Sequence, residues 1–485
     1  MLSRLFSQKV AVSVVFVGAM FMAIMDVTIV NVAVPTLGRD FHTNPAAVDS
    51  VVIGFLVSLA VFIPVSGWLG DRFGTKRVLL AAIAIFTVAS ALCGAAQNLP
   101  ELVGFRVLQG VGGGLMTPVG MAMLFRVFPP AERVRASSIL IVPTALAPAL
   151  GPVLGGLFVT DLTWRWVFYV NVPIGIAAFV FGFIFLDDPR EPHAGRFDLP
   201  GFLLAGAGLG LLMYGVSEGP VKGWRTAMVL STVVVGAILL TALVVVEQRI
   251  REPMLDLSLY RDRLFRSTSL VLAVGSMAFL GVLYMVALFF QDGLGLSALE
   301  SGLNTFPEAL GVMIGSQVIT RALYPRLGPR RIMVSTALSV TVVMSLMSLV
   351  GTGTSLWLIR LLMLLMGFSM SGVFIPAQAA AFATVSRERT GRASTLFNAQ
   401  RQLGGAVGVA VLTTVVTAVN PLHTVAGHVV PHLAAYRVGF LCAAGVMFLA
   451  ALGALTVSDD DAAETIVARR RKARPPVPAQ PQPVS

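Results

Sequence analysis

The chain has 485 residues, of which 56% are hydrophobic and only 12% are charged, and its formal net charge is +11. Water-soluble domains carry about 25% charged residues, so this composition excludes a soluble globular protein. The apolar residues come in runs of about twenty, the length that a helix needs to cross a hydrocarbon layer of ~30 Å. The strands of an outer-membrane barrel would instead alternate polar and apolar residues. We therefore expect an all-α polytopic membrane protein.

Fourteen apolar stretches follow one another along the chain, and each has the length of a membrane-spanning helix. They cover approximately residues 10–35, 46–69, 75–96, 99–124, 135–159, 164–186, 199–217, 225–247, 266–290, 299–322, 331–351, 355–378, 391–418 and 434–457. The connections between them are too short to hold a soluble domain. The two cysteines, Cys93 and Cys442, both lie inside apolar stretches, so neither a disulfide nor a metal site is expected.

The positive charge is unevenly distributed over the connections. If the N-terminus is inside, 27 of the 35 Lys and Arg residues fall in cytoplasmic segments. This bias follows the positive-inside rule and predicts that both termini are cytoplasmic. The net charge therefore orients the protein in a membrane, and no nucleic-acid partner is expected.

Three sequence matches at nearly the same spacing indicate an internal repeat. Gly74-Thr75-Lys76-Arg77 corresponds to Gly328-Pro329-Arg330-Arg331, and Arg106 corresponds to Arg360, each 254 residues later. Arg135-Ala136-Ser137-Ser138 corresponds to Arg392-Ala393-Ser394-Thr395, 257 residues later. Transporters are commonly built from such repeats, with the substrate site near the membrane midplane.

The repeat predicts four parts of the chain. A six-helix bundle over 1–186 precedes two inserted, peripheral helices and a connection over 187–265. A second six-helix bundle covers 266–457. The end of the chain, 458–485, is basic and then rich in Pro and Gln, which predicts a disordered cytoplasmic tail.

The connection after the second stretch contains a group of residues that we call the latch. Its members are Gly67, Asp71, Arg72, Gly74, Lys76 and Arg77. Gly67 allows two helices to approach closely, Asp71 can accept from a helix N-terminus and pair with a basic residue, and Gly74 allows a tight turn. Such a group would stabilise one conformation and break in another. In the second repeat Pro325 replaces the acid, so that copy is expected to be structural only.

The latch resembles the signature loop of the major facilitator superfamily. Four further segments resemble its fourteen-spanner drug:proton antiporters, the EmrB/QacA type. They are Asp26-Val27-Thr28-Ile29-Val30-Asn31-Val32-Ala33-Val34-Pro35, Arg106-x-x-Gln109-Gly110, the antiporter motif Gly151-Pro152-x-x-Gly155-Gly156, and Trp164-Arg165-Trp166-x-Phe168-x-x-Asn171-x-Pro173-x-Gly175. The resemblance implies a major facilitator fold in a bacterial cytoplasmic membrane, driven by a proton gradient and needing no cofactor.

Charged residues inside the membrane are costly and normally face a cavity or a partner. Asp26 and Glu308 are the acids placed well inside the stretches, and Arg106 is the expected partner of Asp26. The resemblance assigns Asp26 and Arg106 to proton coupling, and the alternative is a permanent structural ion pair. Glu308 follows Pro307 and is expected to be a second proton site or an anchor for a cationic substrate. Its alternative place is in interfacial water at the helix end.

Polar residues of the first, fourth and thirteenth stretches are the candidates for a substrate cavity. They are Asn31, Gln109, Asn398, Arg401 and Gln402. A structural Arg that ties helices together is the alternative for Arg401. No nucleotide-hydrolysis motif and no catalytic triad is present in the sequence, so an enzyme is not expected.

The leading prediction is proton-coupled export of lipophilic or cationic drugs and other amphipathic compounds by alternating access. An exporter of membrane lipids or glycolipids, with or without a periplasmic adaptor, is the first alternative. A membrane sensor that binds ligand without transporting it is the second.

Overall fold

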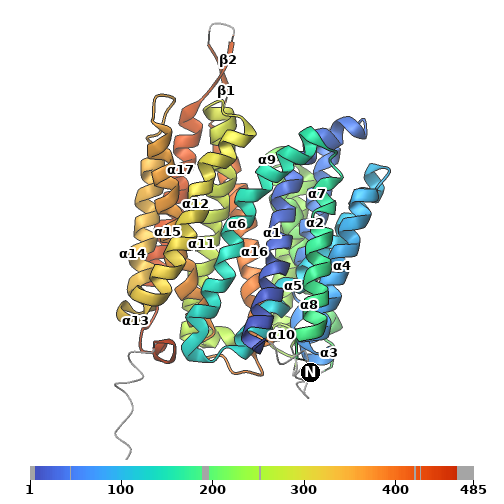
Figure 1. Ribbon diagram of the computed structural model, residues 1–485, viewed down its shortest axis with the longest axis vertical. Coiled ribbons are helices and arrows are strands. Elements are labelled where there is room, and N and C mark those ends of the chain that lie inside the picture. The colour runs from blue at the N-terminus through green and yellow to red at the C-terminus, as the bar shows by residue number, and fades with distance from the viewer. Residues whose placement is uncertain are drawn as a thin grey trace, which may run out of the picture.

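The computed structural model describes residues 6–43, 45–187, 196–250, 253–419, 422–425 and 428–466. Long helices stand side by side and roughly parallel (Figure 1). The start of α1 and the segment that follows α17 lie at the same end of the molecule, which we call the termini end. The predicted topology places both termini on one side of the membrane. It therefore requires an even number of membrane-spanning helices between them.

The helices of the first part of the chain are mostly long, and several contain a break. They are α1 (Gln8–Asp40), α2 (Pro45–Phe62), α3 (Ser66–Phe73), α4 (Thr75–Ala95), α5 (Leu99–Val127), η2 (Pro130–Glu132), α6 (Arg133–Asp161), α7 (Trp166–Tyr169) and α8 (Asn171–Phe185). Two further helices follow, α9 (Leu199–Lys222) and α10 (Ala227–Glu247).

The last part of the chain has the same kind of elements and one small hairpin. They are η3 (Leu257–Arg261), α11 (Arg263–Leu288), η4 (Phe289–Gly293), α12 (Ala298–Val318), η5 (Ile319–Leu323), α13 (Tyr324–Leu327), α14 (Pro329–Met347), α15 (Leu356–Ala381), α16 (Thr390–Ala418), β1 (Leu422–Val425), β2 (His428–Pro431), α17 (Leu433–Ala454) and η6 (Ala463–Thr465). The antiparallel pair β1 and β2 forms where the sequence predicted a loop, with Val425 opposite His428.

Eleven helices in the described residues are long and apolar enough to cross a membrane. The count is twelve if α2 and α3, which meet at an angle of 54°, form one span. The helices α6 and α12 are not among them, so the predicted number of fourteen is met only in part. Both contain polar residues within their length, including Glu300, Asn304 and Glu308 in α12.

The helices pack in two groups around two main apolar clusters, and the first cluster also takes in residues of α11, α15 and α16. Phe16, Phe55 and Phe86, from α1, α2 and α4, are fully buried in the first core. The second core contains Met344 and Met363, from α14 and α15, with further residues of α11 and α17. Because lipid is as apolar as these side chains, close packing rather than removal from water has to hold such helices together.

Glycine provides this close packing between helices. A Cβ atom at Gly110 of α5 would lie 2.5 Å from the carbonyl oxygen of Phe55 in α2. In the second group, a Cβ atom at Gly404 of α16 would lie 2.5 Å from the carbonyl oxygen of Ala273 in α11. The two backbones therefore touch at each place, which any larger residue would prevent.

The sequence predicts that α9 and α10 are peripheral, but α9 is not. Helix α9 packs against α2 of the first group and α16 of the second. Its Leu209 and Met213 are buried against Ala60 of α2, beside Leu403 of α16. The sequence could not show this contact, because apolar residues that face a helix and apolar residues that face lipid look alike.

The end of the chain is folded further than predicted. The tail was expected to be disordered from residue 458, but the described chain continues to Ile466, which is buried. The hydroxyl groups of Thr465 and Tyr324 are 2.7 Å apart, and Asp459 Oδ1 accepts from the backbone N–H of Arg330 at 2.9 Å. These contacts fix residues 458–466, which we call the tail segment. The basic run and the Pro-rich end of the predicted tail lie outside the described residues.

Candidate functional site

Asp26 lies in the middle of α1 with none of its surface exposed. Three side chains donate hydrogen bonds to its carboxylate: Arg106 Nη1 to Oδ2 at 2.5 Å, Gln109 Nε2 to Oδ1 at 2.8 Å, and Asn171 Nδ2 to Oδ1 at 3.0 Å. Arg106 and Gln109 belong to α5, and Asn171 begins α8. Three helices therefore hold one carboxylate, and we call these four residues the Asp26 cluster.

Arg106 is held from several sides. Its Nε donates to the carbonyl oxygen of Val51 in α2 at 3.2 Å, and its Nη1 also donates to Gln109 Oε1 at 2.7 Å. The guanidinium carbon lies 4.3 Å from the ring centre of Phe55. A buried ion pair is tolerated only when its remaining donors and acceptors are satisfied and its geometry is good. Acceptors on Val51, Asp26 and Gln109 satisfy the Nε and Nη1 donors of Arg106, so much of that requirement is met.

The charge balance of the Asp26 cluster depends on one proton. With Asp26 ionised, its negative charge and the positive charge of Arg106 cancel. A proton on Asp26 would leave the Arg106 guanidinium buried without its counter-charge, which is costly in a low-dielectric site. In this conformation the cluster is therefore built around a buried carboxylate–guanidinium pair. The side-chain oxygen of Asn171, which is buried, has no hydrogen-bond partner in the described residues.

The Asp26 cluster is connected to α6 by the antiporter motif. A Cβ atom at Gly151 would collide with the hydroxyl group of Thr28, and one at Gly155 would lie 3.2 Å from the carbonyl oxygen of Ile29. Both glycines therefore press α6 against α1 just after Asp26. Gly156 has open space around it, and the side chain of Pro152 is outside the described residues.

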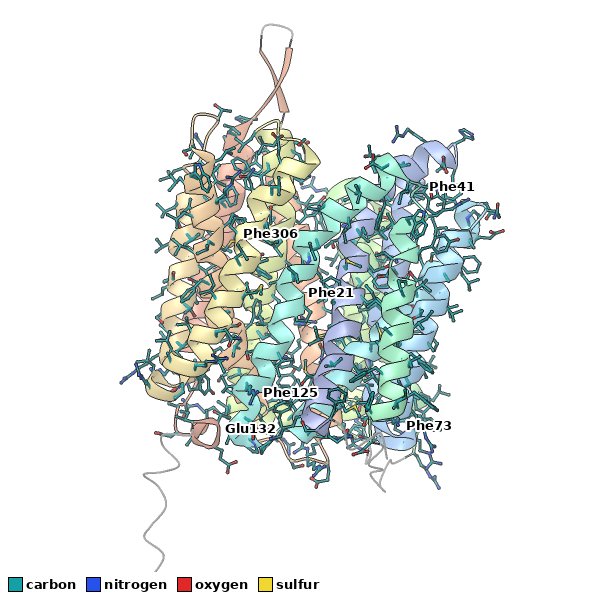
Figure 2. All side chains as sticks on the ribbon, viewed as in Figure 1. Phe21, Phe41, Phe73, Phe125, Glu132 and Phe306 are labelled. Atoms are coloured by element: carbon teal, nitrogen blue, oxygen red, sulfur yellow. The ribbon has the colours of Figure 1, made fainter. Side chains whose placement is uncertain are left out.

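The second candidate acid, Glu308, is 1% exposed on α12, so it does not lie in interfacial water at the helix end. Its Oε1 has no hydrogen-bond partner, and no ion pair reaches the side chain from the described part of the chain. The next residue, Ala309, is packed with Ile141 and Ala145 of α6. Phe306, two residues earlier, lies farther from the termini end than Phe125 and Glu132 do (Figure 2). Among the described residues Glu308 is thus a buried carboxyl group without a partner, beside the helix that also packs on the segment after Asp26.

The candidates for the substrate cavity fall in different places. Asn31 is exposed on α1, and Arg401 and Gln402 are half-buried on α16. Gln109 is fully buried in the Asp26 cluster and lines no open surface. Asn398 is also buried, and its Nδ2 donates to the carbonyl oxygen of Ser394 at 2.9 Å and contacts the sulfur of Met121 at 3.5 Å. Gln109 and Asn398 therefore join helices, whereas Asn31, Arg401 and Gln402 keep some exposed surface.

The latch lies at the termini end, between the two helix groups. Asp71 Oδ1 accepts from Arg126 Nη2 of α5 at 2.7 Å, and both side chains are almost buried. A Cβ atom at Gly67 would lie 2.7 Å from Thr395 Oγ1 of α16, so Gly67 allows a close approach to the second group. Gly74 has a φ of 92° in the turn between α3 and α4, a conformation that favours glycine.

The basic residues of the latch face away from this contact. Lys76 Nζ donates to the carbonyl oxygen of Phe183 in α8 at 3.0 Å, so it fixes the first group internally. The side chains of Arg72 and Arg77 are exposed.

Other contacts close the termini end around the latch. Ser66 Oγ and Thr395 Oγ1 are 3.1 Å apart, and Ser394 Oγ donates to the carbonyl oxygen of Pro118 at 2.7 Å. The rings of Phe125 and Phe382 are stacked with centres 4.4 Å apart. The two groups are therefore joined at the termini end by polar and aromatic contacts that would have to break if this end opened.

Comparison with known proteins identifies the family. The model of the Major Facilitator Superfamily matches residues 16–409. The chain belongs to the major facilitator superfamily. Members of this superfamily are transporters and not enzymes.

Several relatives of this superfamily member carry names that refer to drugs. The chain is 33% identical over 404 residues to the multidrug resistance protein B homolog of Mycobacterium tuberculosis, covering 82% of this chain and 74% of that protein. It is 32% identical, with the same coverage, to the tetracenomycin C resistance and export protein of Streptomyces glaucescens. It is 29% identical over 453 residues to the putative multidrug resistance protein MdtD of Salmonella heidelberg, covering 93% of this chain and 96% of that protein. The resemblance to EmrB/QacA-type drug:proton antiporters is thereby confirmed.

A solved structure confirms the fold alone. The human organic anion transporter MFSD10 (TETRAN) matches with a TM-score of 0.65 and 17% sequence identity, covering 93% of this chain and all of that chain. At this identity the match says nothing about the substrate.

The prediction from the sequence missed one residue of the Asp26 cluster. Asn171 was noted as part of the Trp164–Gly175 segment but not as a partner of Asp26. It also donates to Ser90 Oγ at 3.2 Å, so it connects α8 to α4 as well as to α1. An amide between apolar residues of a membrane helix was the signal that could have found it, because such a group needs partners inside the protein.

Proposed function

We propose that this major facilitator is a proton-coupled antiporter that exports lipophilic or cationic amphipathic compounds. The observation that carries the proposal is the fully buried Asp26 cluster, in which one carboxylate is held by an arginine and two amides. Relatives named for multidrug resistance and for tetracenomycin C export support a drug-like cargo.

The proposed topology has fourteen spans: the eleven helices that are long and apolar enough, the bent pair α2–α3 as one span, and α6 and α12. Both termini would be in the cytoplasm of a bacterial inner membrane, as the positive-inside rule predicts. The two bundles would cover 1–186 and 266–457, with 187–265 as the inserted part. Residues after 457 would form the cytoplasmic tail, of which the structure describes the first part, up to residue 466.

In the proposed cycle, Asp26 releases its proton to the cytoplasm and binds one from the outside. Binding cancels the carboxylate charge, so the cluster has to rearrange to satisfy Arg106. Rotation of the Asn171 amide would turn its unpartnered oxygen toward the protonated carboxyl group. Because α1 is pressed against α6 at Gly151 and Gly155, movement of Asp26 would be passed to α6 and from there to α12 and α15.

We propose that Glu308 is the second group whose charge changes during transport. A buried carboxylate without a partner is costly, so it needs either a proton or a cationic substrate. Exchange of one for the other would couple a cationic cargo to proton movement. Its place beside α6 supports this role, since the same helix packs on the segment that follows Asp26.

The test uses proteoliposomes with an imposed pH gradient, a lipophilic cation as substrate and an internal pH indicator. We expect proton release that depends on the cation in the wild type, and its loss in Asp26→Asn. Glu308→Gln should reduce transport of the cation more than transport of a neutral amphipathic compound. Asp292→Asn removes an exposed acid and should behave as the wild type. Proton-driven efflux at the wild-type rate in Asp26→Asn would show that Asp26 is not the coupling site.

The same liposomes separate the alternatives. A lipid or glycolipid exporter would show no proton response to lipophilic cations but would change the distribution of a labelled lipid between the leaflets. A sensor would bind the compound without moving protons or cargo.

A further inference from the structure

A cavity of about 730 Å³ lies at the termini end, and its walls come from both helix groups. The first group supplies the end of α5, the segment through η2 and the first residue of α6. The second group supplies the connection after α15 and the tail segment. The lining residues are Phe125, Arg126, Val127, Phe128, Pro129, Pro130, Arg133, Ala383, Thr384, Val385, Arg387, Asp461 and Glu464.

The buried part of this cavity is lined by two guanidinium groups with unused donors. Arg133 is only 6% exposed, and its Nε and Nη1 have no hydrogen-bond partner in the described residues. Arg126 binds Asp71 through Nη2, but its buried Nε also has no partner. A buried donor without an acceptor destabilises the fold, and more so if it is charged. Two such groups around one cavity therefore indicate a missing acceptor.

The acids of the cavity do not supply that acceptor. Asp461 and Glu464 are exposed on the tail segment, and neither forms an ion pair with Arg133 in the structure. Arg387 is exposed on the opposite wall. The interior is therefore cationic, while the rim has both signs. A planar guanidinium matches the oxygen atoms of a phosphate group in pairs, and a cavity of this size holds a small organic molecule.

We propose that this cavity binds a phosphate group, from either a free phosphorylated compound or the headgroup of an anionic lipid. Arg133 would be the main ligand, and the Arg126 guanidinium would add positive charge to the wall. Because the cavity is formed by both helix groups, it exists only while the termini end is closed. A bound phosphate would therefore favour that conformation and slow transport from it, an allosteric effect separate from the proton site. This inference does not rest on the proposed function.

The experiment measures the melting temperature of the full chain in nanodiscs of zwitterionic lipid during a titration with pyrophosphate. Ionic strength is held constant with sodium chloride. We expect a saturable rise in the wild type and at least a tenfold loss of apparent affinity in Arg133→Gln. The matched control is Arg135→Gln, which removes an exposed arginine two residues away and should stay within twofold of the wild type.

A second series replaces part of the lipid with phosphatidylglycerol and omits pyrophosphate. Stabilisation of the wild type that is absent in Arg133→Gln would assign the site to a lipid headgroup, and a response to pyrophosphate alone would assign it to a free phosphate. Equal responses of wild type and Arg133→Gln in both series would overturn the proposal.

Glu464→Gln keeps the test independent of whether Arg133→Gln folds. Removing a negative charge from the rim should strengthen binding of the phosphate probe several-fold. Unchanged or weaker binding in this variant would also contradict the site.

Discussion

Arg106 and Arg360 hold equivalent places in the two halves of the repeat, but only Arg106 has a carboxylate. Arg106 Nε donates to Val51 of α2, and Arg360 Nε donates to Asn304 Oδ1 of α12 at 2.9 Å. Each arginine therefore reaches the helix that the repeat puts in the same position. The residue 254 positions after Asp26 is Leu280, so the second half has no acid to complete the pair. Among the described residues, the buried ion pair is thus found at Arg106 and not at Arg360.

This asymmetry predicts different costs for the same substitution. Arg106→Gln leaves Asp26 buried without its counter-charge and should lower the free energy of unfolding by about 3 kcal/mol. Arg360→Gln removes a half-buried group with no carboxylate partner and should cost about 1 kcal/mol. Unfolding of both variants in mixed micelles compares them directly. The double variant Asp26→Asn/Arg106→Gln should recover part of the loss, and equal losses in the two single variants would contradict the assignment.

The contact between α6 and α1 predicts a second pair of variants. Gly151→Val would force a side chain into Thr28 and should lower stability by about 1–3 kcal/mol while also reducing transport. Gly156→Val adds the same side chain where the structure leaves space and should change stability by less than about 0.5 kcal/mol. Thermal unfolding and cation efflux measured on the same preparations check both. Similar behaviour of the two variants would mean that α6 and α1 do not need to touch.

A substitution that breaks a latch contact should change the conformation of the protein without unfolding it. Asp71→Asn breaks the ion pair with Arg126, which lies next to Gly391 of α16. The conformation with a closed termini end should therefore become less populated. A loss of about 1.4 kcal/mol would lower its population relative to the open conformation by roughly tenfold. Spin labels placed on the ends of α3 and α16 report the distance between the two groups. Arg72→Gln changes an exposed latch residue and should leave the distance distribution unchanged. An unchanged distribution in Asp71→Asn would show that the ion pair does not hold this end closed.

A fourth prediction concerns the ion pair between Asp256 and Arg389, which lies in connections outside the spans. Burial would raise the pKa of Asp256, but hydrogen bonds from Ser258 and Arg389 outweigh it and hold the pKa below its ordinary value of 3.8. A depressed carboxyl pKa stabilises the fold above the unfolded pKa, and this contribution is lost as the pH falls through the folded value.

Asp256→Asn should therefore be less stable than the wild type at pH 7, by about 1 kcal/mol because Arg389 is partly exposed. The difference should begin to shrink as the pH falls below about 4, and it should vanish only below the folded pKa of Asp256. Melting temperatures between pH 3 and pH 7 test this, and a difference that stays constant down to the lowest pH would contradict the ion-pair explanation.

The sequence was sufficient for the helical class, the family and the pairing of Asp26 with Arg106. An unpaired charge inside an apolar helix is energetically costly, and few opposite charges are available there. Asp26 and Arg106 are therefore expected to lie close together. The roles of Gln109 and Asn398 could not be predicted in the same way. An amide in an apolar helix can face either a cavity or another helix. The spacing of apolar residues along the helix does not distinguish these two cases. The fold of the tail segment depends on contacts with Tyr324 and Arg330, far away in the sequence, which no local pattern reveals.

The position of α9 makes the two sides of the molecule unequal toward the surrounding lipid. Two bundles side by side have two vertical seams, and α9 covers the seam between α2 and α16, where its loop is also tied by a hydrogen bond from Trp224 Nε1 to Thr414 Oγ1 at 2.9 Å. The other seam, between α6 and α12, has no additional helix over it among the described residues. A hydrophobic compound that diffuses within a leaflet would thus be kept from the seam that α9 covers, but would have access to the seam between α6 and α12. Entry from the bilayer would have a preferred direction, set by a helix that takes no part in the chemistry.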